Sequence, residues 1–572
     1  MSLQFLSFIE NLRDLGIFSD IDVHFAKFMA TLSESADDAL LLGAALASHF
    51  TGVGSSCVDL KILAEQAFPL QADPGMDTLL CPSLSHWQQV LLNCRVVGQP
   101  GDYTPLVLDK HRLYLYRYWD YEQQLAAQIR ARCAMQCTDV NHDILNEGLL
   151  RLFPSQKDQQ KIAALTAILQ HFCIISGGPG TGKTSTIVKI LTLLVEQNPK
   201  LSIALAAPTG KAATRLQAAH LALQDCAPAV KAAIPQEAYT IHRLLGSKPD
   251  SPYFISHASN LLPYDVVVID EASMVDLALM TKLAQAIPKS ARWILLGDKD
   301  QLASVEAGTV LGDICDAGIE KNIVLLDKSY RFSEESGIWK LAQAVKQGES
   351  EKALHILQSD KYPDVNWHYL NDELPTILID QMVSAFSRCL KEKQAAKVLQ
   401  SFENTIILCA LRRGPYGVEA INRKIEEEYR RKGLIRSHYR WYHGRPIMIT
   451  RNDYRLQLFN GDIGIILRKP TGGYELQAFF PDQGGQVRTF WPNRLPEHET
   501  VYAMTIHKSQ GSEFDNVLIL LPDQFSPILT RELIYTGMTR ARKSVSVWGN
   551  EQVFMEAVSQ KITRSSGLRE KL

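Results

Sequence analysis

The sequence contains no long hydrophobic run. No apolar stretch reaches the ~18 residues that a membrane-spanning helix requires. The first twenty residues mix acidic with apolar residues and have no basic segment, so a secretory signal peptide is not expected. Apolar residues make up 46% and charged residues 21% of the chain, proportions typical of a soluble globular protein. We therefore expect a cytoplasmic protein without a membrane segment.

Paired cysteines and an excess of basic residues are also missing. Cys133 and Cys137 lie close together, near His142, but no second pair follows at a similar spacing as a zinc site would require. We therefore expect the ten cysteines to be reduced thiols. The net charge of −2 excludes a protein coated in positive charge, although a local basic groove for nucleic acid stays possible. Any such binding is expected to be local and reversible.

What is present is a chain of 572 residues, too long for one core. At about 150 residues per domain, three or four domains are predicted. From about residue 150, short apolar runs typical of buried strands alternate with segments long enough for crossover helices. The first series is FCIIS (172–176), LSIALAAPT (201–209), DVVVIDEAS (265–273), ARWILLGD (291–298) and KNIVLLD (321–327). A second series is ENTIILCA (403–410), NVLILLP (516–522) and SVSVWGN (544–550), so two parallel α/β sheets are predicted.

Two other regions differ from this pattern. Residues 436–500 are rich in Gly, Pro and short alternating segments, which predicts a small all-β insertion. Residues 1–135 carry mostly helical periodicities, and the alternation in HRLYLYRYW (111–119) predicts a strand before a helix. The aromatic residues of this N-terminal region can pack its own core or form a surface for a partner.

The segment GGPGTGKT (177–184) matches the phosphate-binding loop pattern, with a predicted strand before it and a predicted helix after it. Its backbone N–H groups and the helix N-terminus favour bound phosphates. Lys183 is expected to reach the β- and γ-phosphates, and the hydroxyl of Thr184 to hold Mg²⁺. The nucleotide-contacting residues are predicted to be Gly177, Gly178, Pro179, Gly180, Thr181, Gly182, Lys183, Thr184 and Ser185. The expected cofactors are ATP and Mg²⁺.

Acidic and amide side chains follow two other predicted strands. Asp270 and Glu271 emerge at the carboxyl end of a buried strand, where open α/β sheets bind ligands. Asp270 is placed to bind Mg²⁺ and Glu271 to polarise the attacking water. Gln301, in LLGDKDQL (295–302), is a candidate contact for the γ-phosphate, with Asp298 orienting it.

Two segments supply arginines. SYRF (329–332) places Arg331 after a strand, and YTGMTRARKS (535–544) places Arg540 and Arg542 on an expected helix packed against the last strand. An arginine that reaches the γ-phosphate contributes roughly 10³ to 10⁵ in rate. If Arg540 comes from the second sheet, the nucleotide lies in a cleft between two domains that closes on binding and opens after hydrolysis.

The ordered set of these segments, with APTGKAA, TIHRLL, HKSQGSEFD and YTGMTRA, resembles superfamily 1B DNA helicases. It most resembles the α subunits of RecBCD-type exonuclease V complexes. The resemblance runs from about residue 155 to 550 and implies an α/β fold. The implied organisation is two RecA-like P-loop motor domains (145–345; 346–435 with 501–572), a small SH3-like β insertion (436–500) and a mostly helical N-terminal partner-docking domain (1–135).

The resemblance also assigns roles to single residues. Gln160 matches the glutamine that reads adenine, and Lys183, Thr184, Asp270, Glu271, Gln301, Arg331 and Arg540 match the ATP-hydrolysis positions. In MTIHKSQGSEFDN (504–516), Thr505 and His507 are expected to face the DNA backbone. Gln510, Gly511 and Glu513 of the same loop are expected to face the nucleotide, Glu513 through the ribose hydroxyls. Further DNA-backbone contacts are expected from Pro208, Thr209, Lys211, Thr240 and His242.

The resemblance further implies translocation in the 5′→3′ sense on single-stranded DNA. It implies a heterotrimer with RecB-like and RecC-like subunits that processes duplex DNA ends for recombinational repair. No acidic cluster typical of a two-metal nuclease lies outside the motor motifs, so nuclease activity is expected in a partner. Two alternatives stay open: a free-standing helicase of the same kind, and a mainly regulatory or docking subunit with secondary ATPase activity. Tyr454 and Phe459, which can also pack within the β insertion, are the candidates for base stacking.

Overall fold

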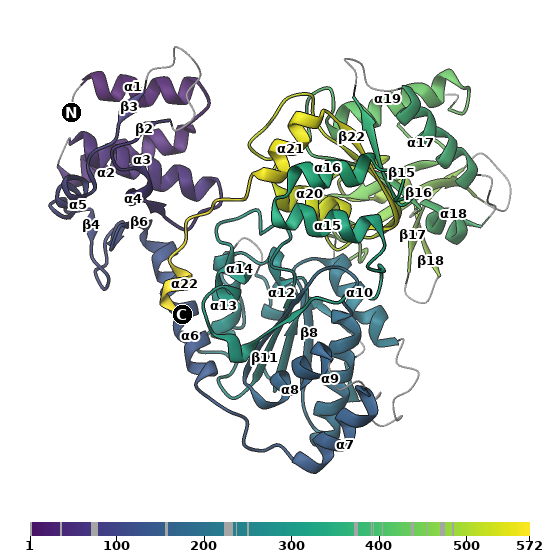
Figure 1. Ribbon diagram of the computed structural model, residues 1–572, viewed down its shortest axis with the longest axis horizontal. Coiled ribbons are helices and arrows are strands. Elements are labelled where there is room, and N and C mark those ends of the chain that lie inside the picture. Colours follow the sequence, from purple (N-terminus) through teal and green to yellow (C-terminus); the bar gives the residue numbers. More distant parts are fainter. Residues whose placement is uncertain are drawn as a thin grey trace.

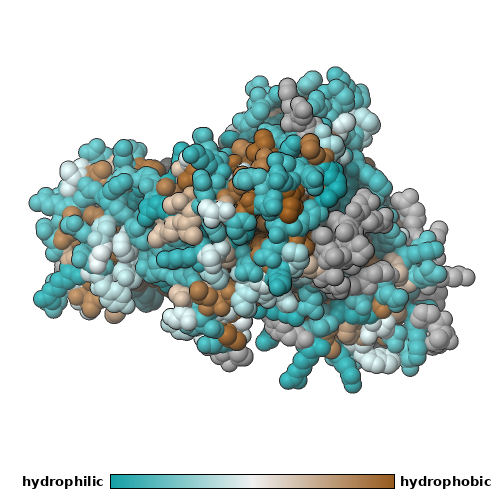
Figure 2. Space-filling view, turned by 90° about the horizontal axis from the view of Figure 1, so that it is seen from below, coloured by the Kyte–Doolittle hydropathy of each residue, from teal (hydrophilic) through white to brown (hydrophobic). Residues whose placement is uncertain are grey.

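In the computed structural model, two lobes pack directly against each other, and the N-terminal region stands beside them, joined through α6 (Tyr116–Cys133) and the last residues of the chain (Figure 1). The structure describes residues 3–34, 37–69, 78–154, 158–221, 233–235, 237–248, 251–370, 376–390, 392, 394–402, 404–435, 440–453, 455–469, 475–482 and 486–572. Within these residues no helix is both long and apolar enough to cross a membrane. Seen from below, the surface is mostly hydrophilic, and its apolar residues gather in separate patches (Figure 2).

The first predicted sheet has six strands, all parallel, in the order β12-β7-β11-β10-β8-β9. The strands are β7 (Phe172–Gly177), β8 (Ile203–Ala207), β9 (Tyr239–Thr240), β10 (Val266–Ile269), β11 (Arg292–Gly297) and β12 (Ile323–Leu326). Because strand side chains alternate between faces, Ile174 and Val267 enter one core cluster, whereas Cys173 and Val268 enter the other. The apolar runs in the sequence are therefore strands that are buried on both faces.

Helices cover both faces of this sheet. One face packs against α7 (His142–Leu152), α8 (Gln159–Leu169), α9 (Lys183–Gln197) and α10 (Gly210–Leu221). The other packs against α6 (Tyr116–Cys133), α12 (Ile241–Leu245), α13 (Leu277–Ala286) and α14 (Val310–Cys315). The short 3₁₀ turns η1 (Ala272–Met274) and η2 (Glu320–Asn322) join these elements. The loops after the strands thus meet at one edge of the sheet. We call this sheet and its helices the first lobe, and the edge faces a second lobe, which is built on the other parallel sheet.

The second sheet is also entirely parallel, in the order β13-β22-β21-β14-β20. Its strands are β13 (Val365–Tyr369), β14 (Thr405–Cys409), β20 (Ala503–Thr505), β21 (Phe514–Leu520) and β22 (Ala541–Gly549). The surrounding helices are α15 (Gly337–Gln347), α16 (Ser350–Gln358), α17 (Thr376–Cys389), α18 (Ala395–Phe402), α19 (Val418–Arg431), α20 (Arg531–Met538) and α21 (Glu551–Ser559), with the turn η5 (His507–Ser509). Strands β13 and β20 have no counterpart in the sequence prediction, because both are short and β13 is only partly buried.

The expected β insertion is a five-stranded antiparallel sheet in the order β18-β17-β16-β15-β19. Its elements are β15 (Arg445–Ile449), β16 (Ile463–Arg468), β17 (Leu476–Pro481), β18 (Val487–Phe490), η4 (Pro492–Arg494) and β19 (His498–Thr500). A small core that includes Ile447, Ile466 and Phe480 holds it together. Its likeness to an SH3 domain stays a prediction.

The N-terminal region forms its own core. It contains α1 (Leu3–Asp14), α2 (Asp20–Ser33), α3 (Asp38–Gly52), α4 (Leu60–Leu63) and α5 (Leu84–Leu92) around the sheet β1 (Val58–Asp59), β6 (Arg112–Leu115), β5 (Leu106–Asp109) and β4 (Val97–Gly98), with the pair β2 (Ala67–Phe68) and β3 (Leu79–Leu80). The expected strand at 111–119 ends earlier than predicted, because α6 begins at Tyr116. Helix α6 then packs against one face of the six-stranded sheet, where it buries Leu125, Ala126 and Ile129.

The last residues of the chain return to this region. After α21, Arg564 donates to the carbonyl oxygens of Ser304 and Glu306, and α22 (Leu568–Lys571) packs beside α6 (Figure 1). The predicted division into domains, with 501–572 in the second motor lobe, stays a prediction. Residues 564–572 contact the N-terminal region and the first lobe.

Glu122 of α6 anchors this return. Its carboxylate is fully buried and accepts hydrogen bonds at 2.6 Å from Ser56 Oγ and at 2.8 Å from Lys571 Nζ. Ser566 Oγ, Gly567 N and Tyr114 Oη also donate to it, at 3.0, 3.1 and 3.2 Å. One buried charge therefore joins α6, the N-terminal sheet and the chain end.

We expect Glu122→Ala to lower the free energy of unfolding by about 3–5 kcal/mol, because the buried ammonium of Lys571 loses its partner at 2.8 Å and keeps Asp109 at 3.6 Å. Glu570→Ala is the matched control, since Glu570 also pairs the chain end with the N-terminal sheet but its side chain is 42% exposed. That loss should stay near or below about 1 kcal/mol. Urea denaturation followed by circular dichroism compares the two variants, and equal losses would contradict the role of Glu122.

Candidate nucleotide and DNA site

The phosphate-binding loop joins β7 to α9. Gly180 and Gly182 adopt left-handed backbone conformations, with φ of +79° and +81°, which side chains other than glycine rarely allow. A Cβ on Gly182 would also lie 2.5 Å from Gln160 Nε2. Lys183 begins α9, and its ammonium donates to the carbonyl oxygens of Gly177 and Gly178. The lysine and the helix N-terminus thus lie together in the loop, as phosphate binding requires.

Gln160 lies beside the phosphate-binding loop. Asp158 caps α8 by accepting a hydrogen bond from the backbone N–H of Gln160 at 2.9 Å. The buried Gln160 side chain then donates from Nε2 to the carbonyl oxygen of Thr181, at 3.2 Å. Its contact with the loop fixes its orientation. Adenine recognition itself stays a prediction.

Asp270 and Glu271 follow β10 directly, as expected. Asp270 is 8% exposed, and its Oδ1 accepts the backbone N–H of Glu271 at 2.8 Å. Burial, and then the charge of Glu271, raise the pKa of Asp270 to about 6, whereas Lys183 acts against that rise. Glu271 has a φ of +52°, an uncommon conformation for a residue with a side chain, and such conformations cluster at functional sites.

The loop after β11 contacts the second lobe. Asp298 and Gln301 are buried, and Gln301 Nε2 donates to Asp298 Oδ2 at 3.1 Å. The same Asp298 oxygen accepts Tyr535 Oη of α20 at 3.0 Å, and Tyr535 Oη lies 2.8 Å from where a Cβ on Gly178 would be. Gln510 Nε2 donates to the carbonyl oxygen of Leu302 at 3.2 Å. Tyr535 was missed from the sequence, where it is one aromatic residue in an apolar helix.

Glu513 is surrounded by arginines from both lobes. Its Oε1 accepts Arg331 Nη2 at 2.7 Å and also pairs with Arg215 Nη2, and its Oε2 accepts Arg542 Nε at 3.2 Å. Burial raises the pKa of Glu513, but the charges of Arg215 and Arg331 outweigh it and hold the pKa at about 2. The expected ribose contact of Glu513 stays a prediction. Arg215 gave no signal in the sequence, because it looks like one charged residue on an amphipathic helix.

Arg331 lies against the phosphate-binding loop. The backbone N–H of Tyr330 donates to the carbonyl oxygen of Gly180 at 2.7 Å, and a Cβ on Gly180 would lie 2.4 Å from Arg331 Cβ. Arg331 Nη2 is taken by Glu513, whereas its Nη1 is buried without a hydrogen-bond partner. A buried guanidinium nitrogen without an acceptor, beside a phosphate-binding loop, is suited to an oxygen of the nucleotide.

Arg540 lies at the seam between the lobes, although its local structure differs from the prediction. The expected helix for Arg540 and Arg542 is wrong: α20 ends at Met538, Arg540 lies in the turn that follows, and Arg542 is on β22. The tight turn is closed by Arg540 Nε donating to the carbonyl oxygen of Thr536 at 3.1 Å. Arg540 is 2% exposed. Burial lowers its pKa, and the nearby carboxylates of Glu271 and Glu513 act in the opposite direction.

Of the predicted DNA contacts, Thr209 lies against the loop 504–513 of the second lobe. A Cβ on Gly511 would be 3.8 Å from Thr209 Oγ1, so the loop 504–513 abuts the start of α10 next to Pro208. The hydroxyls of Thr209 and Thr240 accept backbone N–H groups at the starts of their helices. Burial lowers the pKa of both His242 and His507. Neutral imidazoles would contact DNA through hydrogen bonds rather than through charge.

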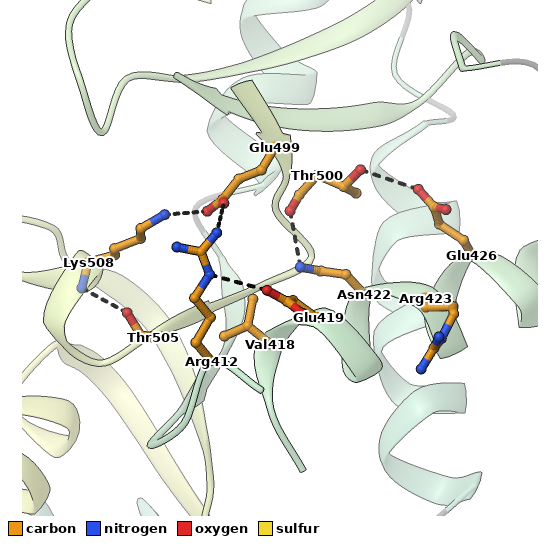
Figure 3. Close-up of a pocket in the computed structure, with 10 residues that line it drawn as sticks. All are labelled: Arg412, Val418, Glu419, Asn422, Arg423, Glu426, Glu499, Thr500, Thr505 and Lys508. Carbon is orange, nitrogen blue, oxygen red and sulfur yellow. Dashed lines mark hydrogen bonds and ion pairs between the residues drawn. The ribbon is translucent and has the colours of Figure 1, made fainter. Parts of the chain in front are cut away.

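A cavity of about 270 Å³ opens beside Thr505 (Figure 3). Arg412, Arg423 and Lys508 line it, and Glu499 pairs with Lys508 at 2.6 Å and with Arg412 at 3.9 Å. The sequence prediction missed these cations, because single basic residues in a loop and on an amphipathic helix carry no signal of their own. Of the two stacking candidates, Tyr454 lies outside the described residues. Phe459 packs 2.9 Å from where a Cβ on Gly210 would be.

Family models match three parts of the chain. They are an AAA domain over residues 159–307, the N-terminal domain of the RecBCD enzyme subunit RecD over 14–114, and a UvrD-like helicase C-terminal domain over 500–548. A phosphate-binding loop faced by arginines of a second parallel α/β lobe, with these matches, defines an ATP-dependent DNA helicase.

Curated relatives show to which family of helicases the chain belongs. The RecBCD enzyme subunit RecD of Mycolicibacterium smegmatis is 38% identical over 97% of this chain and 98% of that protein. The subunit of the same name from Haemophilus influenzae is 34% identical over 98% of this chain and 99% of that protein. The chain belongs to the RecD family. The ATP-dependent RecD2 DNA helicase of Deinococcus radiodurans is 28% identical, and the match covers 58% of it. A solved Pif1 helicase from Candida albicans aligns at a TM-score of 0.39 and 16% identity, over 70% of this chain and 95% of that one.

Proposed function

We propose that this helicase is the 5′→3′ motor subunit of a RecBCD-type helicase–nuclease that processes duplex DNA ends for recombinational repair. The observation that carries the motor role is the seam. The phosphate-binding loop and the carboxylates of one lobe face Arg540 and Tyr535 of the other. A nucleotide held there contacts both lobes, so its binding and hydrolysis change how they are apposed.

The side chains near the loop fit Mg²⁺, which prefers oxygen ligands. Thr184 follows Lys183 at the start of α9, and Asp270 is a buried carboxylate whose pKa is raised by burial and by Glu271. Asp270 is buried and Glu271 is half-buried beside it, and a divalent cation would stabilise the charged forms of both. We assign Thr184 and Asp270 as its protein ligands. The ion would neutralise charge on the β- and γ-phosphates.

The remaining residues act around the γ-phosphate. Glu271 accepts the proton of the attacking water, and Gln301, fixed by Asp298, orients that water. Lys183, Arg331 and Arg540 stabilise the charge that develops on the transferred phosphoryl group. Because Arg540 comes from the second lobe, hydrolysis is fast only when the lobes are apposed.

Single-stranded DNA is held across the two lobes by Pro208, Thr209, Lys211, Thr240 and His242 of the first and by Thr505 and His507 of the second. Hydroxyls, backbone N–H groups and imidazoles bind phosphates without reading base sequence. The loop 504–513 carries both DNA and nucleotide candidates and abuts α10. DNA and ATP are thus bound on the same moving parts, which a translocating motor requires.

The proposed assembly rests on the relatives, whose names describe a RecBCD enzyme subunit and of which this chain matches 98% and 99%. We propose RecB-like and RecC-like partners in a cytoplasmic heterotrimer, with the N-terminal region as the docking part. The nuclease is assigned to a partner, since no two-metal acidic cluster lies outside the motor motifs in the sequence.

Strand polarity tests the proposal. We expect the chain, assembled with its partners, to unwind a duplex with a 5′ single-stranded tail at least ~10-fold faster than one with a 3′ tail, because one of two opposite translocation senses is selected. The isolated chain should unwind only weakly. Lys183→Gln is the control: in the complex, it should abolish the 5′-tail activity and leave a partner's nuclease able to cut. Activity of the Lys183→Gln complex equal to wild type would favour a regulatory subunit instead. Strong unwinding by the chain alone would favour a free-standing helicase.

A further inference from the structure

Helix α10 joins the DNA side of the first lobe to its nucleotide side. It begins at Gly210, directly after Pro208 and Thr209, and carries Lys211 in its first turn. Residues four apart lie on the same helix face, about 6 Å along the axis, so Arg215 follows Lys211 on one face. Lys211 Nζ lies 5.9 Å from the centre of the Phe514 ring, and a Cβ on Gly511 would lie 3.7 Å from Ala212 Cβ. The start of the helix thus packs on the loop that ends at Glu513.

Arg215 carries the contact across the seam. Its Nη2 donates to Glu513 Oε1 of the second lobe, and the Glu513 side chain is only 7% exposed. Burial lowers the pKa of Arg215, but the carboxylate of Glu513 and, next in strength, that of Glu271 raise it overall. Arg215 in turn lowers the pKa of Asp270. Its guanidinium is therefore close to the carboxylates expected to run hydrolysis.

The other arginines at Glu513 are placed differently. Arg331 follows β12 and lies on the phosphate-binding loop, whereas Arg542 is on β22 of the same lobe as Glu513 and is 47% exposed. Of the three arginines paired with Glu513 in the described part of the chain, Arg215 alone is carried by the helix that starts at the predicted DNA contacts.

We propose that Arg215 is a positioning residue that transmits DNA binding at the start of α10 to the hydrolysis site through its ion pair with Glu513. The inference rests on the proposed function. A short helix moves as a rigid unit, so a shift of Thr209 and Lys211 onto a DNA phosphate displaces Arg215 too. Glu513 then exchanges partners between Arg215 and the arginines beside it. This changes the positions of Arg331 and of the seam around Glu271.

The test separates coupling from binding and from folding. ATP turnover of Arg215→Ala is measured with and without a 20-nucleotide oligo-dT, and oligo-dT affinity is measured by fluorescence anisotropy. We expect the stimulation by DNA to fall by about 10-fold or more, a usual size for coupling between sites. Basal turnover, KM for ATP and oligo-dT affinity should each change by less than about 3-fold, which is under 0.7 kcal/mol of binding free energy. Arg215→Lys, which keeps the charge but loses the planar fork, should recover part of the stimulation.

Arg542→Ala is the matched control. It also removes one arginine from Glu513, but not the one that comes from the DNA side, so its stimulation ratio should stay close to wild type. The double variant Arg215→Ala with Glu513→Gln should lose no more stimulation than the larger single loss, because the two residues act as one pair.

Several outcomes would overturn the inference. They are an equal fall in basal and stimulated turnover, an equal loss in Arg542→Ala, additive losses in the double variant, and a parallel loss of oligo-dT affinity. Should Arg215→Ala melt early, Arg215→Lys decides, since full stimulation or none at all in a stably folded lysine variant contradicts a graded positioning role. If oligo-dT did not stimulate the ATP turnover of the wild-type protein, the proposed function itself would be contradicted. If DNA stimulated the ATP turnover of Arg215→Ala as strongly as that of the wild type, only this inference would be contradicted.

Discussion

Arg540→Ala is expected to lower ATP turnover by about 10³-fold or more while nucleotide affinity stays nearly intact. The reason is the position of Arg540, which comes from the second lobe and lies buried near Glu271. An arginine that stabilises charge only as the phosphoryl group is transferred contributes little to ground-state binding. Turnover is measured at saturating ATP and affinity by titration with a fluorescent ATP analogue.

Two variants control this result. Arg540→Lys keeps a cation but loses the planar guanidinium, so most of the loss should remain. Arg542→Ala removes the arginine two residues further along, which is half-exposed on β22 and pairs with Glu513, and its turnover should fall far less. A fall in affinity as large as the fall in turnover would assign Arg540 to nucleotide binding and would contradict the seam mechanism.

Glu271→Gln should lower turnover by about 10²–10⁴-fold, the usual contribution of a general base. The amide keeps the size of the side chain and the unusual backbone at φ +52° but cannot accept the proton of the attacking water. ATP should then bind and close the lobes without being hydrolysed. Single-turnover hydrolysis of radiolabelled ATP measures the chemical step directly.

The control for this variant is Glu306→Gln, an exposed acid in the loop after β11 of the same lobe. It should leave the chemical step unchanged, since its side chain is not near the carboxylates of β10. Near-normal hydrolysis in Glu271→Gln, with ATP still bound, would assign the base role to another group, such as Asp298, which accepts a hydrogen bond from Gln301.

The strands and the phosphate-binding loop could be predicted because their signals are local. A continuous apolar run such as Val266–Ile269 is compatible with burial on both faces of a parallel sheet. The glycines of the loop are also a local signal, because the φ values of +79° at Gly180 and +81° at Gly182 favour glycine over other residues. Asp270 and Glu271 follow from the same logic, because the end of a buried strand places them at the ligand edge.

Predictions that depended on where a local element ends were less accurate. HRLYLYRYW alternates like a strand, yet Tyr116 starts α6, because the residues after it continue at helical spacing and bury Leu125 and Ile129 in the first motor core. Arg540 was expected on a helix, but the chain turns after Met538 to enter β22. Local propensity does not fix such boundaries, since tertiary packing selects among nearly equal alternatives.

By itself the sequence determined the two parallel sheets, the β insertion, the phosphate-binding loop and the chemical types around it, because each depends on residues that are neighbours in the chain. Only the tertiary structure decided which charges meet. Glu513 collects Arg215, Arg331 and Arg542, Tyr535 reaches Asp298, and Glu122 binds the chain end at Lys571. These partners lie 29 to 449 residues apart in sequence. These residues pair because of the way the lobes pack. No local pattern in the sequence shows that residues so far apart in the chain are in contact.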